Sequence, residues 1–325
     1  MIENELMRIL TGGWVAQATN VAARLGIPDA LADGPRTAAD LAEALKVHPG
    51  ALTRLLRLLA AAGILEGRGE RFALTEMGAL LRRDQLGPLA ALYASDYFTA
   101  SWAALESNVT TGEQGFHHVY GRPVFDYLAD EPDRAAEFNA GMAAGTLYFR
   151  RVPEKHDFTG ARTVVDLAGG TGALLAEVLR AVPEARGVLF DVPEVIATAG
   201  PHLEGLLERC ELVAGDLFAA VPDGGDVYML SRVLHDWDDE QCAAILANCA
   251  KAMPPGARLL VIERVAGADA LLPAAFDLHM MVMTDGRERT LPEYRALLGQ
   301  AGLTIEYVTE LPLGMSLLNA VMETT

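Results

Sequence analysis

Hydrophobic residues recur at two different spacings along the chain of 325 residues, and the change between them falls near residue 160. Before that point the apolar positions follow the spacing of amphipathic helices, as in WVAQATNVAARLGIPDAL (14–31) and PGALTRLLRLLAAAGIL (49–65). From residue 161 onward, short strand-like apolar runs alternate with helical segments. The pattern predicts an N-terminal domain over 1–100, connecting helices over 101–160 and a larger domain over 161–325.

The N-terminal region is predicted to hold three helices followed by a short hairpin. One helix begins at Thr37, whose hydroxyl can form a capping box with Asp40 three residues later, and the next ends at Gly63. Gly67 and Gly69 then mark a turn between two short strands. This order is typical of a winged helix, which is compatible with DNA binding or with a dimerisation module of the same shape.

The C-terminal region is predicted to form an α/β domain with a Rossmann-like, mostly parallel sheet. Alternation of strands and helices is the pattern of a parallel sheet covered by helices on both faces. The last two strands are too close for a helical crossover, so they are expected to pair antiparallel. The predicted strands are TVVDLA (163–168), GVLFDV (187–192), CELVAG (210–215), DVYMLSRVL (226–234), ARLLVIERV (257–265), TIEYVTELP (304–312) and MSLLNAVME (315–323).

Composition narrows the class of partner. The 44 acidic and 26 basic residues give a formal charge of −18, which repels nucleic acid and anionic membranes and favours a neutral or cationic small molecule. No apolar run has the length of a membrane span or the arrangement of a signal peptide. Cys210, Cys242 and Cys249 form no CxxC pair, which favours a reducing compartment. A cytoplasmic protein without a cysteine-based metal site is therefore expected.

A glycine-rich turn, AGGTG (168–172), follows the first strand of the predicted sheet. Ligands bind at this edge of such sheets, and glycine lets them approach the backbone. No Gly-Lys-Ser/Thr follows, which argues against a P-loop, and Leu175 stands where a dinucleotide fingerprint needs glycine. Asp166, just before the turn, suits an ammonium or sulfonium group better than a pyrophosphate.

Two more acidic residues follow the next two strands. Asp191 ends the second strand, where a carboxylate can accept both hydroxyls of a ribose. Asp216 follows the third strand, where a carboxylate can accept the amino group of adenine between Leu217 and Phe218. Each acid alone is as compatible with a helix cap or a turn as with a ligand. Three acids at successive strand ends indicate a cationic nucleoside ligand.

These segments resemble the S-adenosylmethionine-dependent small-molecule O-methyltransferases of the acetylserotonin and caffeate type, including bacterial natural-product enzymes. The resemblance covers nearly the whole chain, and its most specific parts are RVLHDW (232–237) and DGRERT (285–290). It implies a homodimer formed through a winged-helix-like N-terminal domain, and a reaction without a metal. It departs from the family at Ala168, where glycine is usual. The segments that carry it are VVDLAGGTGALLAEVL, FDVPEVI, AGDLF, YMLSRVLHDWDDE, RLLVIERV and DGRERTLPEYRALLGQAGL.

The resemblance also implies roles for individual residues. His235 would be the general base, with Asp236 beside it and Glu263 or Glu288 orienting its ring. S-Adenosylmethionine would be held by Asp166, Ala168, Gly169, Gly170, Asp191, Asp216, Leu217, Phe218 and Arg232. Phe138 and Met142 in the connecting helices, and Met281 in an apolar stretch, are candidates for binding a flat aromatic substrate, although core packing is the usual role of such residues.

The expected reaction is methylation of a phenolic hydroxyl in a secondary metabolite. A phenol has a pKa near ~10, so a histidine titrating near ~6.5 can take its proton during attack. Without the ligand pattern, His235 would more often be a polar residue at a helix start. Three alternatives stay open: nitrogen methylation or non-methylating chemistry on the same scaffold, a winged-helix regulator that senses a ligand, and a nicotinamide-dependent oxidoreductase, which Leu175 and Asp166 disfavour.

Overall fold

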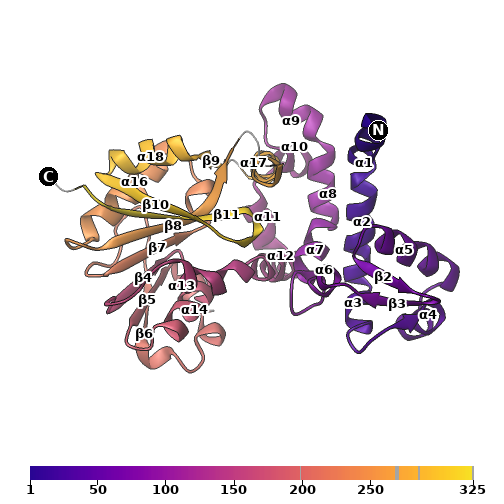
Figure 1. Ribbon diagram of the computed structural model, residues 1–325. Helices are drawn as coiled ribbons and strands as arrows, with labels where there is room; N and C mark the ends of the chain where they lie inside the picture. Colours follow the sequence, from indigo (N-terminus) through magenta and orange to yellow (C-terminus); the bar gives the residue numbers. More distant parts are fainter. Residues whose placement is uncertain (198, 268–270, 285, 324–325) are drawn as a thin grey trace. The chain divides into compact units, whose positions relative to one another are not determined.

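The computed structural model describes residues 1–197, 199–267, 271–284 and 286–323, and the chain divides into two compact units (Figure 1). The first unit comprises Met1–Ser107 and Phe116–Thr146, and the second comprises Asn108–Gly115 and Leu147–Thr325. The boundaries expected at residues 100 and 160 remain a prediction.

The first unit is helical apart from a small sheet with the strand order β1-β3-β2. Helix α4 begins with the predicted capping box: Asp40 N donates to the Thr37 hydroxyl (3.1 Å), and Thr37 N donates to the Asp40 carboxylate (3.3 Å). The predicted hairpin is formed by β2 and β3, which pair antiparallel. The last residues of α9, from Asn108 on, and the first residue of α10 belong to the second unit. The elements are α1 (Ile2–Leu10), α2 (Gly12–Arg24), α3 (Ile27–Ala30), β1 (Arg36–Thr37), α4 (Ala38–Leu45), α5 (Pro49–Ala61), β2 (Leu65–Arg68), β3 (Arg71–Leu74), α6 (Glu76–Ala79), α7 (Gly87–Tyr93), α8 (Asp96–Ala103), α9 (Leu105–Thr111), α10 (Gly115–Tyr120), α11 (Val124–Asp130) and α12 (Pro132–Ala144).

The second unit is built on a sheet with the order β10-β11-β8-β7-β4-β5-β6, to which β9 adds by pairing with β8. The strands β8, β7, β4, β5 and β6 are parallel, and β10 and β11 pair antiparallel, as the sequence predicts. The elements are η1 (Leu147–Arg151), α13 (Val152–Lys155), β4 (Thr163–Leu167), α14 (Ala173–Ala181), β5 (Arg186–Asp191), α15 (Pro193–Ile196), η2 (Gly200–Leu203), η3 (Leu207–Arg209), β6 (Cys210–Ala214), β7 (Val227–Ser231), η4 (Leu234–Asp236), α16 (Asp239–Ala252), β8 (Arg258–Ala266), α17 (Leu271–Met283), β9 (Arg289–Thr290), α18 (Leu291–Gln300), β10 (Leu303–Glu310), η5 (Pro312–Gly314) and β11 (Met315–Met322).

Helices cover both faces of this sheet, which is why its central strands are apolar on both sides. Helices α16 and α18 pack on one face, and α13 and α14 lie on the other (Figure 1). Helix α16 begins at a capping box in which Asp238 accepts from Gln241 N (2.8 Å). Helix α17 covers residues 271–283, for which no helix was predicted.

One predicted strand is too long. The run DVYMLSRVL was expected to stay extended to Leu234, but β7 ends at Ser231. Arg232 then adopts a left-handed backbone (φ 55°), which ends the strand because the chain turns there. The buried carboxylate of Glu263 accepts the next two backbone N–H groups, from Val233 (2.8 Å) and Leu234 (2.9 Å). The apolar pattern of residues 226–234 does not reveal that Glu263 accepts these N–H groups, so it could not predict where β7 ends.

None of the helices within the described residues has the length and apolar character needed to cross a bilayer. Cys210, Cys242 and Cys249 are free thiols.

Candidate active site

The glycine turn between β4 and α14 is shaped by the residues that pack behind it. A Cβ atom added at Gly169 would lie 2.5 Å from a methyl carbon of Leu189 and 2.6 Å from the carboxyl carbon of Asp166. Gly170 and Gly172 have left-handed backbones, with φ of 61° and 80°. Only glycine fits at 169, because a side chain there would collide with Leu189 and Asp166 behind the turn.

Ala168, the departure from the family pattern, has φ 49°. This left-handed conformation costs an L-residue roughly 1–2 kcal/mol relative to glycine. The turn therefore keeps its shape at Ala168 at the expense of some stability.

Asp166 is buried in the middle of the sheet behind this turn. Within the described part of the chain its Oδ2 atom has no hydrogen-bond partner. Burial is the main cause that raises the pKa of this carboxyl, to about 7. A buried carboxyl oxygen that lacks a hydrogen-bond partner can accept from an ammonium group or from a bridging water. The turn is therefore compatible with the charged amino-acid part of S-adenosylmethionine.

Asp191 and Asp216 lie at the ends of the next two strands, as predicted. Asp191 accepts hydrogen bonds from Gly170 N (2.9 Å) and Val192 N (2.7 Å), and Asp216 accepts from Phe218 N (2.9 Å). Each carboxylate oxygen has a second lone pair, so both residues keep acceptor capacity for a nucleoside. These bonds hold turns and cap no helix of the described residues, since α15 (Pro193–Ile196) follows Val192 without a side-chain cap, and they are compatible with ligand binding.

Phe218 is 38% exposed, and its ring lies edge-on to that of Trp237 with centroids 4.9 Å apart. Leu217 packs against the core on the α16 side of the sheet. Asp216 also borders a cavity of about 490 Å³ that runs along β5 and β6. This side of the sheet edge thus offers apolar surface next to a carboxylate, which fits an adenine base.

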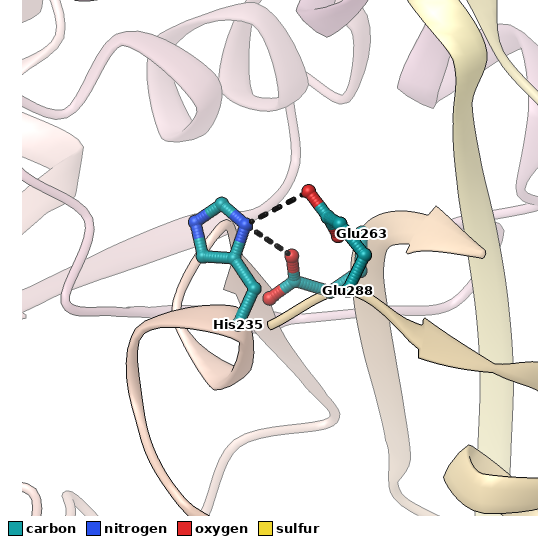
Figure 2. Close-up of side chains that lie close together, drawn as sticks. All are labelled: His235, Glu263 and Glu288. Atoms are coloured by element: carbon teal, nitrogen blue, oxygen red, sulfur yellow. Dashed lines mark hydrogen bonds and ion pairs between the residues drawn. The ribbon is translucent and has the colours of Figure 1, made fainter. Parts of the chain in front are cut away.

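His235 lies on the short helix η4, which follows the turn at Arg232. Figure 2 shows its ring beside two acids: Nδ1 is 3.4 Å from Glu288 Oε1 and 3.6 Å from Glu263 Oε2. Nε2 is 3.7 Å from Asp236 Oδ1. His235, Glu263 and Glu288 are all buried. The structure thus brings together the four predicted catalytic residues, and both glutamates face the same ring nitrogen.

These acids control the protonation of His235. Burial by itself would lower the pKa of the imidazole, but the charges of Glu263, Asp236 and Glu288, together with the hydrogen bond to Glu288, outweigh it and raise the pKa to about 9. Burial in turn raises the pKa of Glu263 to about 7. The expectation of a histidine titrating near 6.5 is therefore wrong for this site, because three acids surround the ring and their effect outweighs that of burial.

The cluster of His235, Glu263 and Glu288 also has the spacing of a cation site. One donor atom from each lies within 4.8 Å of the other two. A histidine nitrogen must be unprotonated to bind a metal, whereas a pKa raised to about 9 keeps His235 protonated at neutral pH. The charges favour an internal ion pair, and the predicted absence of a metal remains a prediction.

The remaining predicted residues lie apart from this cluster or at its edge. Arg232 directly follows β7, and its backbone N donates to Ile262 O (3.0 Å). Met281 is half-buried on α17. Phe138 and Met142 are on α12 in the first unit, whereas His235 is in the second, so their role in binding a substrate stays a prediction.

Glu288 and the histidine loop are fixed by contacts that were not predicted from the sequence. Glu288 N donates to Asp277 Oδ1 (3.0 Å) on α17, and Arg287 N donates to His235 O (2.9 Å). A Cβ atom at Gly286 would lie 2.1 Å from His235 O. The segment GRERT was singled out from the sequence, but only for Glu288.

Comparison with known proteins shows the family to which the chain belongs. Residues 102–304 match the model of an O-methyltransferase domain, and residues 7–84 match that of an O-methyltransferase dimerisation domain. The chain is 43% identical over 327 residues to 3-amino-4-hydroxybenzoate 4-O-methyltransferase of Streptomyces cremeus, covering 98% of this chain and 89% of the relative. It is 35% identical to phenazine-1-carboxylate N-methyltransferase of Pseudomonas aeruginosa, covering 95% and 94%.

A solved structure extends the comparison to ligands. The O-methyltransferase NcsB1 from neocarzinostatin biosynthesis, in complex with S-adenosyl-L-homocysteine and 1,4-dihydroxy-2-naphthoic acid, has a TM-score of 0.71 and 33% identity, covering 95% of this chain and 96% of that one. The fold and the two matched domains define a class I methyltransferase with a dimerisation domain. The chain belongs to the S-adenosylmethionine-dependent O-methyltransferase family.

Proposed function

We propose that this O-methyltransferase methylates a phenolic hydroxyl of an aromatic natural product, with His235 as the general base. The observation that carries the proposal is the buried cluster of His235, Glu263 and Glu288, in which His235 lies three residues after the turn at Arg232 that ends a central strand. The aromatic hydroxy acids in the names of the Streptomyces relative and of the NcsB1 complex support a phenolic acceptor.

The methyl donor in this proposal is S-adenosylmethionine, whose sulfonium supplies an activated methyl group. The glycine turn with Ala168, Gly169 and Gly170, and the acid Asp166, would hold its amino-acid part. Asp191 would accept the ribose hydroxyls, and Asp216, Leu217 and Phe218 would surround the adenine. Arg232 was also predicted to bind S-adenosylmethionine and stays a candidate for that role. The orphan oxygen of Asp166 and the lone-pair capacity of Asp191 support these assignments.

In this proposal, His235 receives the proton of the substrate hydroxyl. With Nδ1 turned toward Glu263 and Glu288, this nitrogen carries the hydrogen, and Nε2 accepts the proton of the substrate hydroxyl. The two carboxylates stabilise the resulting imidazolium. They also keep most of the histidine protonated at neutral pH, because its pKa is raised to about 9. The rate should therefore increase with pH up to about 9, where the neutral base becomes abundant.

We further propose a homodimer formed through the N-terminal domain, for which the match to the dimerisation domain is the support. The apolar side chains of α1, including Leu6, Met7 and Leu10, are exposed and are the expected contact.

Nitrogen methylation is the second candidate, since a relative that is 35% identical is named as an N-methyltransferase. A neutral aromatic nitrogen needs no base to attack a methyl sulfonium. The dependence on His235 therefore separates the two reactions.

The test is turnover of His235→Ala and His235→Gln with labelled methyl donor and 3-amino-4-hydroxybenzoate or 1,4-dihydroxy-2-naphthoate, with the methylated atom located by NMR. Loss of the base should lower kcat by roughly 10²–10⁴-fold while the affinity for S-adenosylhomocysteine, measured by calorimetry, stays within about threefold. Methylation of oxygen at an undiminished rate in both variants would remove His235 from the mechanism. Transfer to the amino nitrogen of 3-amino-4-hydroxybenzoate at an undiminished rate would favour the second candidate.

A further inference from the structure

Arg289 has the largest fully buried side chain in the described part of the chain. It lies on β9, next to Glu288, in the segment that pairs in parallel with the end of β8. A guanidinium keeps its charge in proteins, and burying it is costly unless its N–H groups find acceptors. The groups that accept hydrogen bonds from Arg289 therefore show which part of the protein its buried side chain stabilises.

All three nitrogens of Arg289 donate to the loop that carries His235. Nη1 donates to Leu234 O (2.6 Å), Nη2 to Trp237 O (2.7 Å) and Nε to Asp239 Oδ1 (2.9 Å). Leu234 directly precedes His235 in the chain, and Trp237 follows it by two positions. The guanidinium thus spans the backbone on both sides of the histidine.

This loop needs such outside contacts, because its own structure is a single short helical turn. Glu263 accepts the N–H groups of Val233 and Leu234, and Arg289 donates to the carbonyl groups of Leu234 and Trp237. The loop is therefore fixed from two sides by buried charged groups of opposite sign. Asp239 completes the arrangement, since it also accepts two hydrogen bonds from Arg287 Nη2 (3.0 and 2.8 Å).

We propose that Arg289 is a positioning residue that holds the His235 loop in register with Glu288 for proton transfer. Glu288 directly precedes Arg289, the first residue of β9, so Arg289 ties the backbone beside the histidine to the segment that presents its acidic partner. This inference rests on the proposed role of His235 as the base. Misplacement of a reacting group by about 1 Å can cost on the order of a hundredfold in rate.

The variant Arg289→Lys tests this role, because it keeps the positive charge and cannot span the same three acceptors. The first readout is the pKa of the His235 imidazole, followed by NMR of protein labelled at histidine. It should fall from about 9 toward 6.5 as the ring moves away from its acids. The second is turnover of 3-amino-4-hydroxybenzoate, in which kcat should fall about 10- to 100-fold while KM changes less than about threefold.

Arg209→Lys is the matched control. Arg209 likewise donates to backbone carbonyl groups, those of Leu179, Val182, Pro183 and Ala185, but at the other end of the sheet where β5 begins. Both substitutions should lower the melting temperature, so the melting temperature does not discriminate between them. Only Arg289→Lys should change the His235 pKa and kcat.

If Arg289→Lys does not fold, Asp239→Asn decides, since it leaves Arg289 in place and removes its anionic partner. The same changes are then expected in smaller measure, about threefold to tenfold in kcat. A folded Arg289→Lys or Asp239→Asn protein with the wild-type His235 pKa and kcat would overturn the proposal, as would equal changes in Arg209→Lys. Activity of His235→Ala tests the base itself, whereas the NMR titration still decides the positioning role.

Discussion

The rim of the sheet formed by Asp166, Asp191 and Asp216 and the loop of His235 are built in different ways. Asp191 and Asp216 accept hydrogen bonds from backbone N–H groups of their own turns or of the adjacent glycine turn. His235 instead lies 3.4 Å from an acid of the segment before β9 and 3.6 Å from an acid of β8. Hydrogen bonds to backbone N–H groups shape the rim, and charged side chains set the chemistry of the loop. The two regions should therefore respond to mutation in different observables.

The largest expected effect at the rim is on the affinity for the donor and its product. Asp191→Asn should weaken binding of S-adenosylhomocysteine by about 10- to 100-fold, because the substitution removes an anionic acceptor for hydroxyl groups. Isothermal calorimetry measures this directly. Asp226→Asn is the control, since Asp226 also accepts two backbone N–H groups, from Arg162 (2.7 Å) and Thr163 (2.9 Å), at the opposite edge of the sheet. Equal losses of affinity in both variants would show that Asp191 only holds the backbone of its turn and of the glycine turn.

The loop should respond in its pH profile. Glu263→Gln and Glu288→Gln each remove a charge that raises the pKa of His235, so the rise of kcat with pH should move to lower pH. A pH–rate profile from pH 6 to 10 measures the shift, with Asp191→Asn as the variant that should keep the wild-type midpoint. An unchanged midpoint in both glutamine variants would show that these acids do not govern the titration.

Activity should also survive dialysis against a chelator. Loss of activity would indicate a cation held by His235, Glu263 and Glu288.

Stability should depend on pH through the loop. The pKa of His235 is raised from 6.5 to about 9 in the folded protein, so its contribution is present below pH 6.5 and is lost as the pH rises toward 9. Glu263, whose pKa is raised to about 7, acts in the same direction at lower pH. The free energy of unfolding should fall between pH 6.5 and 9, by on the order of 3 kcal/mol at most, since one pKa unit is worth about 1.4 kcal/mol. Denaturant titrations measure it, and His235→Ala should flatten the curve.

The smallest expected effect is a change in the free energy of unfolding at Ala168, in the glycine turn beside the rim. Ala168→Gly should raise the free energy of unfolding by about 1 kcal/mol, because glycine adopts φ 49° without strain. Lys46→Gly is the control: Lys46 has φ 54° at the exposed end of α4, so it should gain similar stability. Donor affinity should change in neither variant by more than about threefold. A destabilised Ala168→Gly protein would mean that the methyl group contributes more packing than strain.

The sequence by itself determined the features that depend on near neighbours. Alternating strands and helices gave the parallel sheet, Thr37 and Asp40 gave a capping box, and the acids Asp191 and Asp216 were placed at strand ends, where the structure has them. Each depends on periodicity or on hydrogen bonds within a few residues, and such patterns are visible in the order of the residues.

Only the tertiary structure decided where β7 ends and how His235 titrates. The N–H groups beyond β7 are accepted by Glu263, about 30 positions away, and the ring of His235 faces Glu288, 53 positions away. Arg289 reaches back 55 positions to Leu234 O. Burial and the charges around a group shift its pKa through space rather than along the chain. Residue order specifies which groups are present, and the folded contacts set the distances that determine their protonation.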